Sequence, residues 1–419
     1  MKKNQHVVKT DNDLDVKDEK NTRFTSSSQE SPAKPMDGED LSFLKQVKFS
    51  DPIKKLEELM SQNKRSFLIG AGCSLCAGLP LTTQLTTEVK NDSELLGSTK
   101  DVLQIIETKF SGSVTATIED YMSELVDLLS IAERREESKS TNTKIDIDGK
   151  TYEAKQLRDA LKDIKSSIAR CIESRKLNIS SHREFVRAVH QILRSGKGNG
   201  VNSVDYFILN YDTLIEDVLA LERLSYSDGF SGGSTAWWDD SVFSQDGIRA
   251  RVFKIHGSID WVQLDEDPLP RRIRLSGQNF TDINLKDKVM IWPAATKYQE
   301  SQKDPFAQIL AVMRVALRPA VHSETVIAIC GYRFGDSHIN IEIDRALRES
   351  EGRLTVLIFT ENDCPVGQLK LWFDDVTVRE QVRIYAKRGF YHGQTSVTSE
   401  TDMPWWKFEV LTRILGGER

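Results

Sequence analysis

The apolar residues of this chain repeat in two patterns, which predict strands and helices. Short apolar runs that end at polar or glycine-rich turns predict buried strands at 67–69, 204–209, 252–255, 289–292, 326–329 and 354–359. Apolar residues three and four positions apart predict helices at 53–59, 118–129, 157–172, 185–193, 214–221, 306–317 and 339–347. Because strands and helices alternate again from residue 203 onward, we predict an α/β fold with a mainly parallel sheet and helices on both faces.

The same pattern predicts where the folded domain begins and ends. Residues 1–43 are polar and charged with little apolar periodicity, so we expect a disordered or flexible tail. Residues 44–395 are expected to form one Rossmann-like domain, interrupted at about 90–198 by a helical insertion. The charged stretch 133–150, which turns at Asp148 and Gly149, is expected to be a surface excursion. Residues 396–419 predict a C-terminal helix, which we interpret either as an assembly element or as a helix docked on the core.

The composition narrows the class of protein. The chain has 419 residues, of which 39% are hydrophobic and 29% charged, as is typical of globular proteins. Its net charge of −6 argues against broad nucleic-acid binding. Five cysteines at irregular spacing predict no disulfide framework, and the single Cys-x-x-Cys pair, Cys73 and Cys76, predicts packing residues and no zinc. An apolar run long enough to cross a bilayer and a secretory signal are both missing from the sequence, so we expect a cytoplasmic protein.

The first candidate site is the glycine-rich turn after the strand at 67–69. Gly70, Ala71 and Gly72 lead directly into a predicted helix that contains Ser74. A turn of this kind exposes backbone N–H groups with the positive end of a helix dipole behind them, which suits the pyrophosphate of a dinucleotide. Because Gly-x-Gly also occurs in purely structural turns, this turn alone leaves both interpretations open.

Three more polar clusters follow predicted strands. Asn210 and Asp212 come after 204–209, His256 comes after 252–255, and the run 331–340 comes after 326–329. Ligands of open α/β sheets bind beyond the carboxyl ends of the strands, so we expect these clusters and the glycine turn to share one cleft. Histidine titrates near neutral pH, and His256 can therefore accept a proton from a ribose hydroxyl.

Each of these clusters also has a structural interpretation. Asp212 precedes an apolar helix and is a normal N-cap, and Asn210 is a common turn residue. A single histidine such as His256 is more often structural than catalytic, and Asp336 can cap the helix that follows 326–329. The shared location of the clusters at strand ends favours a site for a sugar with several hydroxyl groups.

Taken together, the clusters resemble the motifs of the sirtuin family, the silent information regulator proteins. Gly70-Ala71-Gly72-Cys73-Ser74 with Ala77-Gly78-Leu79-Pro80 resembles the opening motif, Asn210-Tyr211-Asp212 the Asn-x-Asp signature, and His256-Gly257 the catalytic His-Gly. The run Gly331-Tyr332-Arg333-Phe334-Gly335-Asp336-Ser337-His338-Ile339-Asn340 is similar to sirtuin-like proteins of bacterial anti-phage defence, as is Trp292-Pro293 with Lys297-Tyr298-Gln299-Glu300. The resemblance spans roughly residues 67–347.

Departures from the protein-deacylating sirtuins favour a different reaction. Those enzymes carry Asp-Phe-Arg where this chain has Leu81-Thr82-Thr83, and the sequence lacks their paired Cys-x-x-Cys zinc module. The helical insertion lies between the first and second motifs, where it can reshape or cover the pocket. The resemblance therefore implies an NAD hydrolase that releases nicotinamide and ADP-ribose, with NAD as its substrate. An NAD-dependent deacylase or ADP-ribosyl transferase, and a non-enzymatic NAD or ADP-ribose sensor, stay open as alternatives.

The resemblance also implies a role for each candidate residue. In the catalytic set, Asn210 orients the ribose or the attacking water, Asp212 binds the carboxamide or offsets positive charge, and His256 accepts a hydrogen bond or a proton. The predicted cofactor-binding set consists of Gly70, Ala71, Gly72, Ser74, Thr82, Gly331, Tyr332, Phe334 and Asp336. Tyr298 is a weaker candidate for the pocket wall.

The resemblance further implies partners. Sirtuin-like defence proteins form oligomers, often with a HerA-type ATPase or another phage-sensing partner, so we expect a homo-oligomer and a partner of this kind. Candidate assembly surfaces are the N-terminal tail, the excursion at 134–150 and the C-terminal segment with Trp405 and Trp406. We expect no membrane partner and no direct broad nucleic-acid binding.

Overall fold

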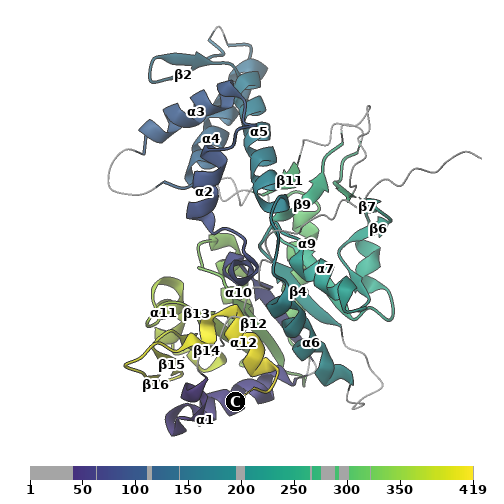
Figure 1. Ribbon diagram of the computed structural model, residues 1–419, viewed down its shortest axis with the longest axis vertical. Helices are drawn as coiled ribbons and strands as arrows, with labels where there is room; N and C mark the ends of the chain where they lie inside the picture. The colour runs from purple at the N-terminus through teal and green to yellow at the C-terminus, as the bar shows by residue number, and fades with distance from the viewer. Residues whose placement is uncertain are drawn as a thin grey trace, which may run out of the picture. The chain divides into compact units, whose positions relative to one another are not determined.

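A nine-stranded sheet forms the centre of the fold (Figure 1). The computed structural model describes residues 41–62, 64–110, 116–140, 142–194, 203–264, 267–274, 288–291, 302–320 and 322–418, without the side chains of 191–194. In spatial order the strands are β16 (Thr395–Thr398), β15 (Gly389–His392), β14 (Val382–Ala386), β13 (Leu354–Thr360), β12 (Thr325–Cys330), β1 (Arg65–Ile69), β4 (Val204–Ile208), β8 (Ala250–Lys254) and β5 (Tyr226–Ser227). The pairs from β14 to β5 are parallel, whereas β14, β15 and β16 pair antiparallel to one another.

The parallel pairing follows from the apolar character of the strands. Every residue of β1, β4 and β12 is buried, as expected for strands that are covered on both faces. β1 lies between the other two, so that Phe67 pairs with Ala328 of β12 and with Tyr206 of β4. The predicted α/β, Rossmann-like class with a mainly parallel sheet is therefore confirmed.

Helices cover both faces of this sheet. Phe67 and Ile69 belong to the apolar layer under α1 (Val47–Met60), α6 (Ser180–Arg194), α7 (Leu214–Leu221) and α12 (Phe408–Leu415). Leu68 belongs to the opposite layer, under α9 (Phe306–Leu317), α10 (Ser337–Glu349) and α11 (Gly367–Asp374). Successive residues of β1 thus point to opposite faces, which is the two-residue period of a strand.

The C-terminal helix is part of the interior. Trp405, Phe408 and Leu411 are buried, and α12 packs against α6 and against the 3-10 helix η2 (Ala71–Ala77). The other 3-10 helices are η1 (Ser42–Lys45), η3 (Asp240–Ser244), η4 (Arg379–Gln381) and η5 (Pro404–Trp406). Of the two interpretations of this segment, the structure places the helix on the core, while a role in assembly stays a prediction.

A helical layer with its own apolar core follows η2. It consists of α2 (Thr82–Lys90), α3 (Gly97–Thr108), α4 (Ile118–Glu137) and α5 (Ala154–Glu173), and α4 packs on α5 (Figure 1). The charged excursion is the end of α4 followed by the hairpin of β2 (Ile145–Ile147) and β3 (Lys150–Tyr152). Its turn has positive φ at Asp148 and Gly149, as the Asp-Gly pair predicts. α6 packs instead on α7 and α12, with the central sheet.

A second, antiparallel sheet was not predicted. Its strands are, in spatial order, β11 (Lys288–Met290), β9 (Gly257–Val262), β10 (Arg271–Ile273), β7 (Thr235–Trp238) and β6 (Phe230–Gly232). The segment predicted as a strand at 289–292 contributes β11, which joins this sheet rather than the central one. α5 contacts β9 and β11, so the helical layer packs on this second sheet.

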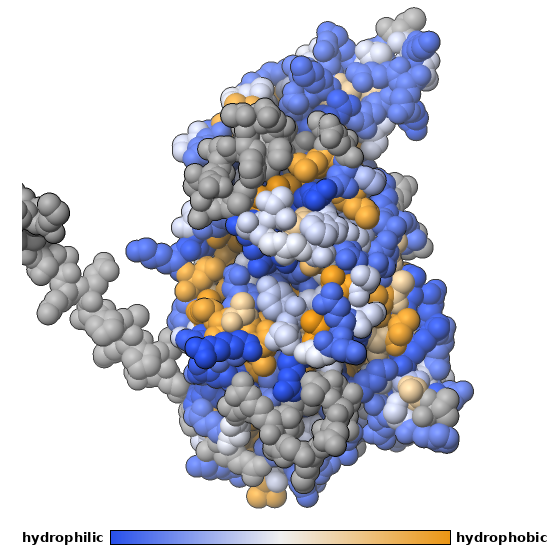
Figure 2. Space-filling view, turned by 90° about the vertical axis from the view of Figure 1, so that its right-hand side faces the viewer, coloured by the Kyte–Doolittle hydropathy of each residue, from blue (hydrophilic) through white to orange (hydrophobic). Residues whose placement is uncertain are grey.

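The surface carries both polar and apolar residues. Figure 2 shows one face, on which apolar residues gather across the middle while hydrophilic residues dominate toward both ends. Exposed large apolar side chains include Leu221, Trp237 and Val315. Within the described ranges, no helix combines the length and the apolar character that a membrane span requires.

Candidate functional site

The four predicted clusters follow four neighbouring strands of the central sheet, β12, β1, β4 and β8. Backbone hydrogen bonds continue past the strand ends and tie the clusters together. Gly70 N donates to Cys330 O at 2.9 Å, and Leu209 N donates to Ile69 O at 2.9 Å. Ile255 N donates to Ile208 O, again at 2.9 Å. The clusters therefore converge on one carboxyl-terminal edge, where α/β sheets bind their ligands.

The glycine turn packs backbone to backbone against the fourth cluster. A β-carbon at Gly70 would collide with the carbonyl oxygen of Gly331, and one at Gly72 would lie 2.9 Å from the α-carbon of Gly331. Gly72 N donates to Gly331 O at 3.0 Å, so the amide that was predicted to face a pyrophosphate is engaged within the protein. The helix after the turn is the 3-10 helix η2, which begins at Ala71.

Gly331 explains the close approach of these two turns. Its φ is +63°, a left-handed conformation that favours glycine, and a β-carbon there would collide with Cys73 N. Gly331 belongs to the predicted cofactor-binding set, in which a glycine lets the backbone approach a ligand closely. The structure shows such an approach, but its partner is the chain's own glycine turn.

Asn210, Ser74 and Asp212 form a buried hydrogen-bonded chain. Asn210 Nδ2 donates to Ser74 Oγ at 2.8 Å and to Gly70 O at 3.1 Å, and Ser74 Oγ donates to Asp212 Oδ2 at 2.8 Å. The three side chains are 8%, 4% and 7% exposed. Because both Nδ2 hydrogens are used within the protein, Asn210 can offer a ligand only its Oδ1, which is an acceptor for a water or a hydroxyl.

Asp212 contacts Ser74 at the predicted site and also caps the helix that follows. Its Oδ1 accepts a hydrogen bond from Leu214 N at 3.2 Å, at the start of α7. The charge on Asp212 also acts on His182, a buried residue of α6, whose pKa burial lowers to about 4 while Asp212 opposes that shift. Sequence reasoning missed His182, although its spacing to Phe185 and Val186 places it on the apolar face of that helix.

His256 lies in the short turn between β8 and β9 and faces the fourth cluster. Its ring centroid is 5.6 Å from that of His338, at 48° between the ring planes, and both residues are buried. His338 is the second residue of α10, which follows β12, and two strands separate β12 from β8. The turns after β8 and β12 therefore meet above the ends of β1 and β4. The ring of His256 packs on His338.

The aromatic residues of the fourth cluster pack on each other. The rings of Tyr332 and Phe334 are 4.7 Å apart, and Phe334 has a φ of +60°. Asn340 Nδ2 donates to Phe334 O at 2.8 Å, and the Tyr332 hydroxyl donates to Asn340 Oδ1 at 3.1 Å and accepts from Asp336 N at 3.1 Å. Burial raises the pKa of Tyr332. The predicted role of Tyr332, Phe334 and Asp336 in cofactor binding stays a prediction.

Two predicted residues lie apart from these clusters or cannot be placed. Thr82 is the first residue of α2 and accepts a hydrogen bond from Thr86 Oγ1 at 2.7 Å through its main-chain oxygen, in the helical layer. Tyr298 lies outside the described residues, as do Trp292, Pro293 and the rest of the segment 297–300.

Of the two cysteines of the glycine turn, Cys73 is buried and Cys76 is partly buried. Burial raises the pKa of Cys73 far above its usual value, and the neighbouring thiol of Cys330 adds to the shift. Burial likewise raises the pKa of Cys76 to about 12. That Cys73 and Cys76 serve as small packing residues stays a prediction. Among the described residues, no group of three or more histidine, cysteine or acidic side chains is arranged to hold a metal ion.

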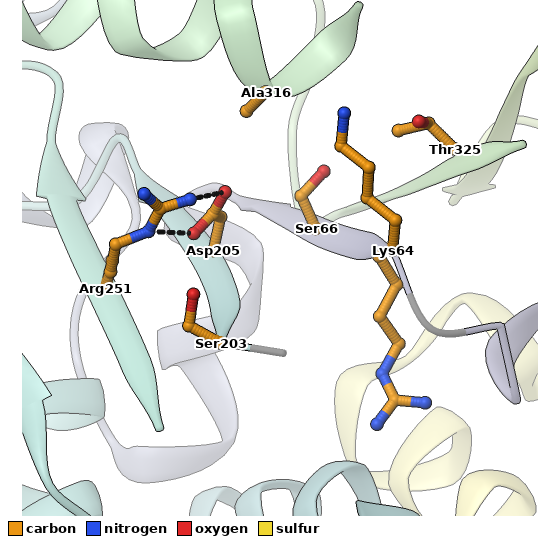
Figure 3. Close-up of a pocket in the computed structure, with 8 residues that line it drawn as sticks. Lys64, Ser66, Ser203, Asp205, Arg251, Ala316 and Thr325 are labelled. Carbon is orange, nitrogen blue, oxygen red and sulfur yellow. Dashed lines mark hydrogen bonds and ion pairs between the residues drawn. The ribbon is translucent and has the colours of Figure 1, made fainter. Parts of the chain in front are cut away.

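A cavity of about 240 Å³ lies at the opposite, amino-terminal edge of the sheet (Figure 3). Arg251 forms two hydrogen bonds of 2.7 Å with Asp205, and Lys64 Nζ donates to Arg318 O at 2.8 Å. The cavity is thus separated from the four clusters by the length of the strands. Its three cations, Lys64, Arg65 and Arg251, already have partners, so it does not enter the proposed chemistry.

A Rossmann-like sheet with polar turns gathered at its carboxyl edge is an arrangement in which α/β proteins commonly bind nucleotides. Within this chain, residues 205–379 match the family model of the SIR2-like domain. The match starts in β4 and covers the second, third and fourth clusters, and it supports the predicted resemblance to sirtuins and an NAD-related activity. No curated protein matches the chain.

Proposed function

We propose that this protein is an NAD hydrolase that cleaves the bond between nicotinamide and ribose. The SIR2-like match supports the use of NAD. The observation that carries the proposal is the buried chain of Asn210, Ser74 and Asp212 at the carboxyl edge of the sheet, with His256 on the neighbouring turn. The sequence predicted Asn210, Asp212 and His256 for the ribose and nicotinamide and Ser74 for the pyrophosphate. Main-chain hydrogen bonds link the three strand ends from which the turns that carry them begin.

The reaction needs little acid catalysis. Nicotinamide leaves as a neutral molecule when its bond to C1′ of the ribose breaks, and water adds there to give ADP-ribose and one proton. The enzyme must hold the dinucleotide, stabilise an oxocarbenium-like ribose and place the water. Asn210 Oδ1 accepts a hydrogen bond from that water or from a ribose hydroxyl, the carboxylate of Asp212 offsets the positive charge, and His256 takes up the proton.

Water fits this site better than a peptide acceptor does. The ring centroids of His256 and His338 are 5.6 Å apart, and we propose that the two rings narrow the approach to the ribose. The segment Leu81-Thr82-Thr83, which replaces the Asp-Phe-Arg of deacylating sirtuins, leads here into α2 and the helical layer. Hydrolysis is therefore preferred over transfer to an acyl-lysine or to another protein.

The biological role that we propose comes from the resemblance alone. A cytoplasmic NAD hydrolase that depletes NAD after infection would serve bacterial anti-phage defence. Such an enzyme harms its own cell unless it is gated, and we propose a homo-oligomer with a HerA-type ATPase or another phage-sensing partner as the gate.

The test is to incubate the purified protein with NAD, alone and with the product of the neighbouring gene, and to identify the products by chromatography. Equal amounts of nicotinamide and ADP-ribose support hydrolysis, and cyclic ADP-ribose would indicate cyclisation instead. Turnover that requires an acyl-lysine peptide or a protein acceptor would favour the deacylase or transferase. Binding of NAD without any product would favour a sensor.

A further inference from the structure

A buried lysine lies directly behind the turn that carries Asn210 and Asp212. Lys254 is the last residue of β8 and is 1% exposed. Its Nζ donates a hydrogen bond to the main-chain oxygen of Asp212 and lies 3.8 Å from Glu216 Oε1 in α7. Glu216 is itself 2% exposed, so both charges are removed from water.

The stability of the fold does not account for this ion pair. Charges removed from water lose their hydration, and apolar residues of similar size at such positions are often as stable or more stable. Burial raises the pKa of Glu216 to about 7, and the charges of Lys254 and Arg274 oppose that shift while Asp260 reinforces it. A costly pair at this position therefore points to a role in the adjacent turn.

Residues on both sides of His256 hold the same turn. Ile259 N donates to Tyr211 O at 3.0 Å, and Ser258 Oγ donates to the same oxygen at 3.2 Å. Lys254, two residues before His256, holds the next carbonyl along the turn, that of Asp212. Consecutive carbonyls of the second cluster are thus fixed by donors that flank the histidine of the third cluster.

We propose that Lys254, with Glu216 as its counter-ion, is a positioning residue for the reaction at this site. It fixes the main chain of Asp212 and thereby sets the distance from the side chains of Asn210 and Asp212 to His256. This inference rests on the proposed NAD hydrolysis, and Lys254 itself does not touch the substrate. A displacement of about 1 Å in a catalytic group can lower a rate about a hundredfold. The hydrogen bond from Lys254 Nζ to the main-chain oxygen of Asp212 therefore has a catalytic benefit that offsets the cost of burying the lysine.

The test compares four variants with the wild-type protein. Lys254→Met removes the donor but leaves Glu216 buried without its cation, and Glu216→Gln keeps the donor. The double variant Lys254→Met/Glu216→Gln removes the hydrogen bond to Asp212 O and leaves no lone buried charge. Lys64→Met is the matched control, because Lys64 Nζ also donates to a main-chain oxygen, that of Arg318, at the opposite edge of the sheet.

Three readouts are measured on each variant: the melting temperature, the release of nicotinamide from NAD, and hydrogen exchange of the peptide that spans residues 209–215. For the double variant we expect a wild-type melting temperature, faster exchange in that peptide, and a kcat lower by about ten- to a hundredfold with KM changed less than about threefold. Lys64→Met keeps wild-type exchange and a kcat within about threefold of the wild type, whereas Lys254→Met and Glu216→Gln each leave one buried charge unpaired and lower the melting temperature.

A double variant with wild-type exchange and wild-type kcat would overturn the positioning role. If the double variant recovers both the turnover and the melting temperature that Lys254→Met loses, the ion pair of Lys254 and Glu216 is merely structural. If the wild-type protein itself releases no nicotinamide, the proposed function fails, and the exchange of the 209–215 peptide still decides whether Lys254 holds the turn.

Discussion

Replacing Gly331 by alanine tests whether the glycine turn and the fourth cluster are packed as the structure shows. Gly331 has a φ of +63°, and a β-carbon there would collide with Cys73 N and lie 2.9 Å from the carbonyl carbon of Gly72. A residue other than glycine in this conformation costs about 1–2 kcal/mol. Forcing packed atoms apart adds about 1–3 kcal/mol. We therefore expect Gly331→Ala to lower the free energy of unfolding by about 2–5 kcal/mol.

The matched control is Gly352→Ala. Gly352 also has a positive φ, +83°, but a β-carbon there would have no described atom within 4 Å. Its loss is therefore limited to the backbone strain of about 1–2 kcal/mol. Urea unfolding at neutral pH, followed by tryptophan fluorescence, measures both losses. Equal losses in the two variants would refute the close packing of the glycine turn on Gly331.

Three side chains near the site give shorter tests. Ser74→Ala removes the donor to Asp212 and should lower kcat for nicotinamide release by about ten- to a hundredfold, because a hydrogen bond to a charged group contributes about 1.5–3 kcal/mol. An unchanged kcat would argue against a catalytic role of the hydrogen bonds that join Asn210, Ser74 and Asp212. His256→Ala should keep its melting temperature and lose turnover, whereas a collapse in melting temperature supports a structural histidine. Burial holds the pKa of His182 near 4, below 6.5, so the unfolded chain binds more protons between these values. The wild type should lose about 3 kcal/mol of stability as pH falls through this window. His182→Gln should show no such loss of stability with falling pH. Urea unfolding of both proteins at the two ends of this pH window tests the difference.

Five strands of the central sheet, β1, β4, β8, β12 and β13, could be predicted because each contains a short apolar run, whereas β5, β14, β15 and β16 were not predicted. Phe67 to Ile69 and the equivalent runs of β4 and β12 are buried on both faces, which leaves a strong local signal. The polar clusters then follow from the topology, since parallel strands bring their carboxyl ends to one edge. The second sheet could not be predicted this way. Strands such as β6 and β10 have three residues each, and β10 carries Arg271 and Arg272 among its three.

Tertiary contacts decide the rest of the site and leave little trace in the sequence. The spacing of Gly70, Gly72 and Gly331 predicts tight turns, but only the fold shows that these glycines face one another. Lys254 follows an apolar run and reads as a residue at the edge of a strand, yet its side chain is buried against Asp212. The pairing of His256 with His338 depends on two turns that are more than 80 residues apart.

The most direct test of the central claim is a crystal structure of the protein with ADP-ribose bound. We predict that the ribose next to the cleaved bond lies between Asn210 and His256, with the pyrophosphate beside the glycine turn that starts at Gly70. ADP-ribose bound at the opposite edge of the sheet, in the cavity lined by Lys64 and Arg251, would contradict this placement, as would a structure in which saturating ADP-ribose leaves the carboxyl edge empty.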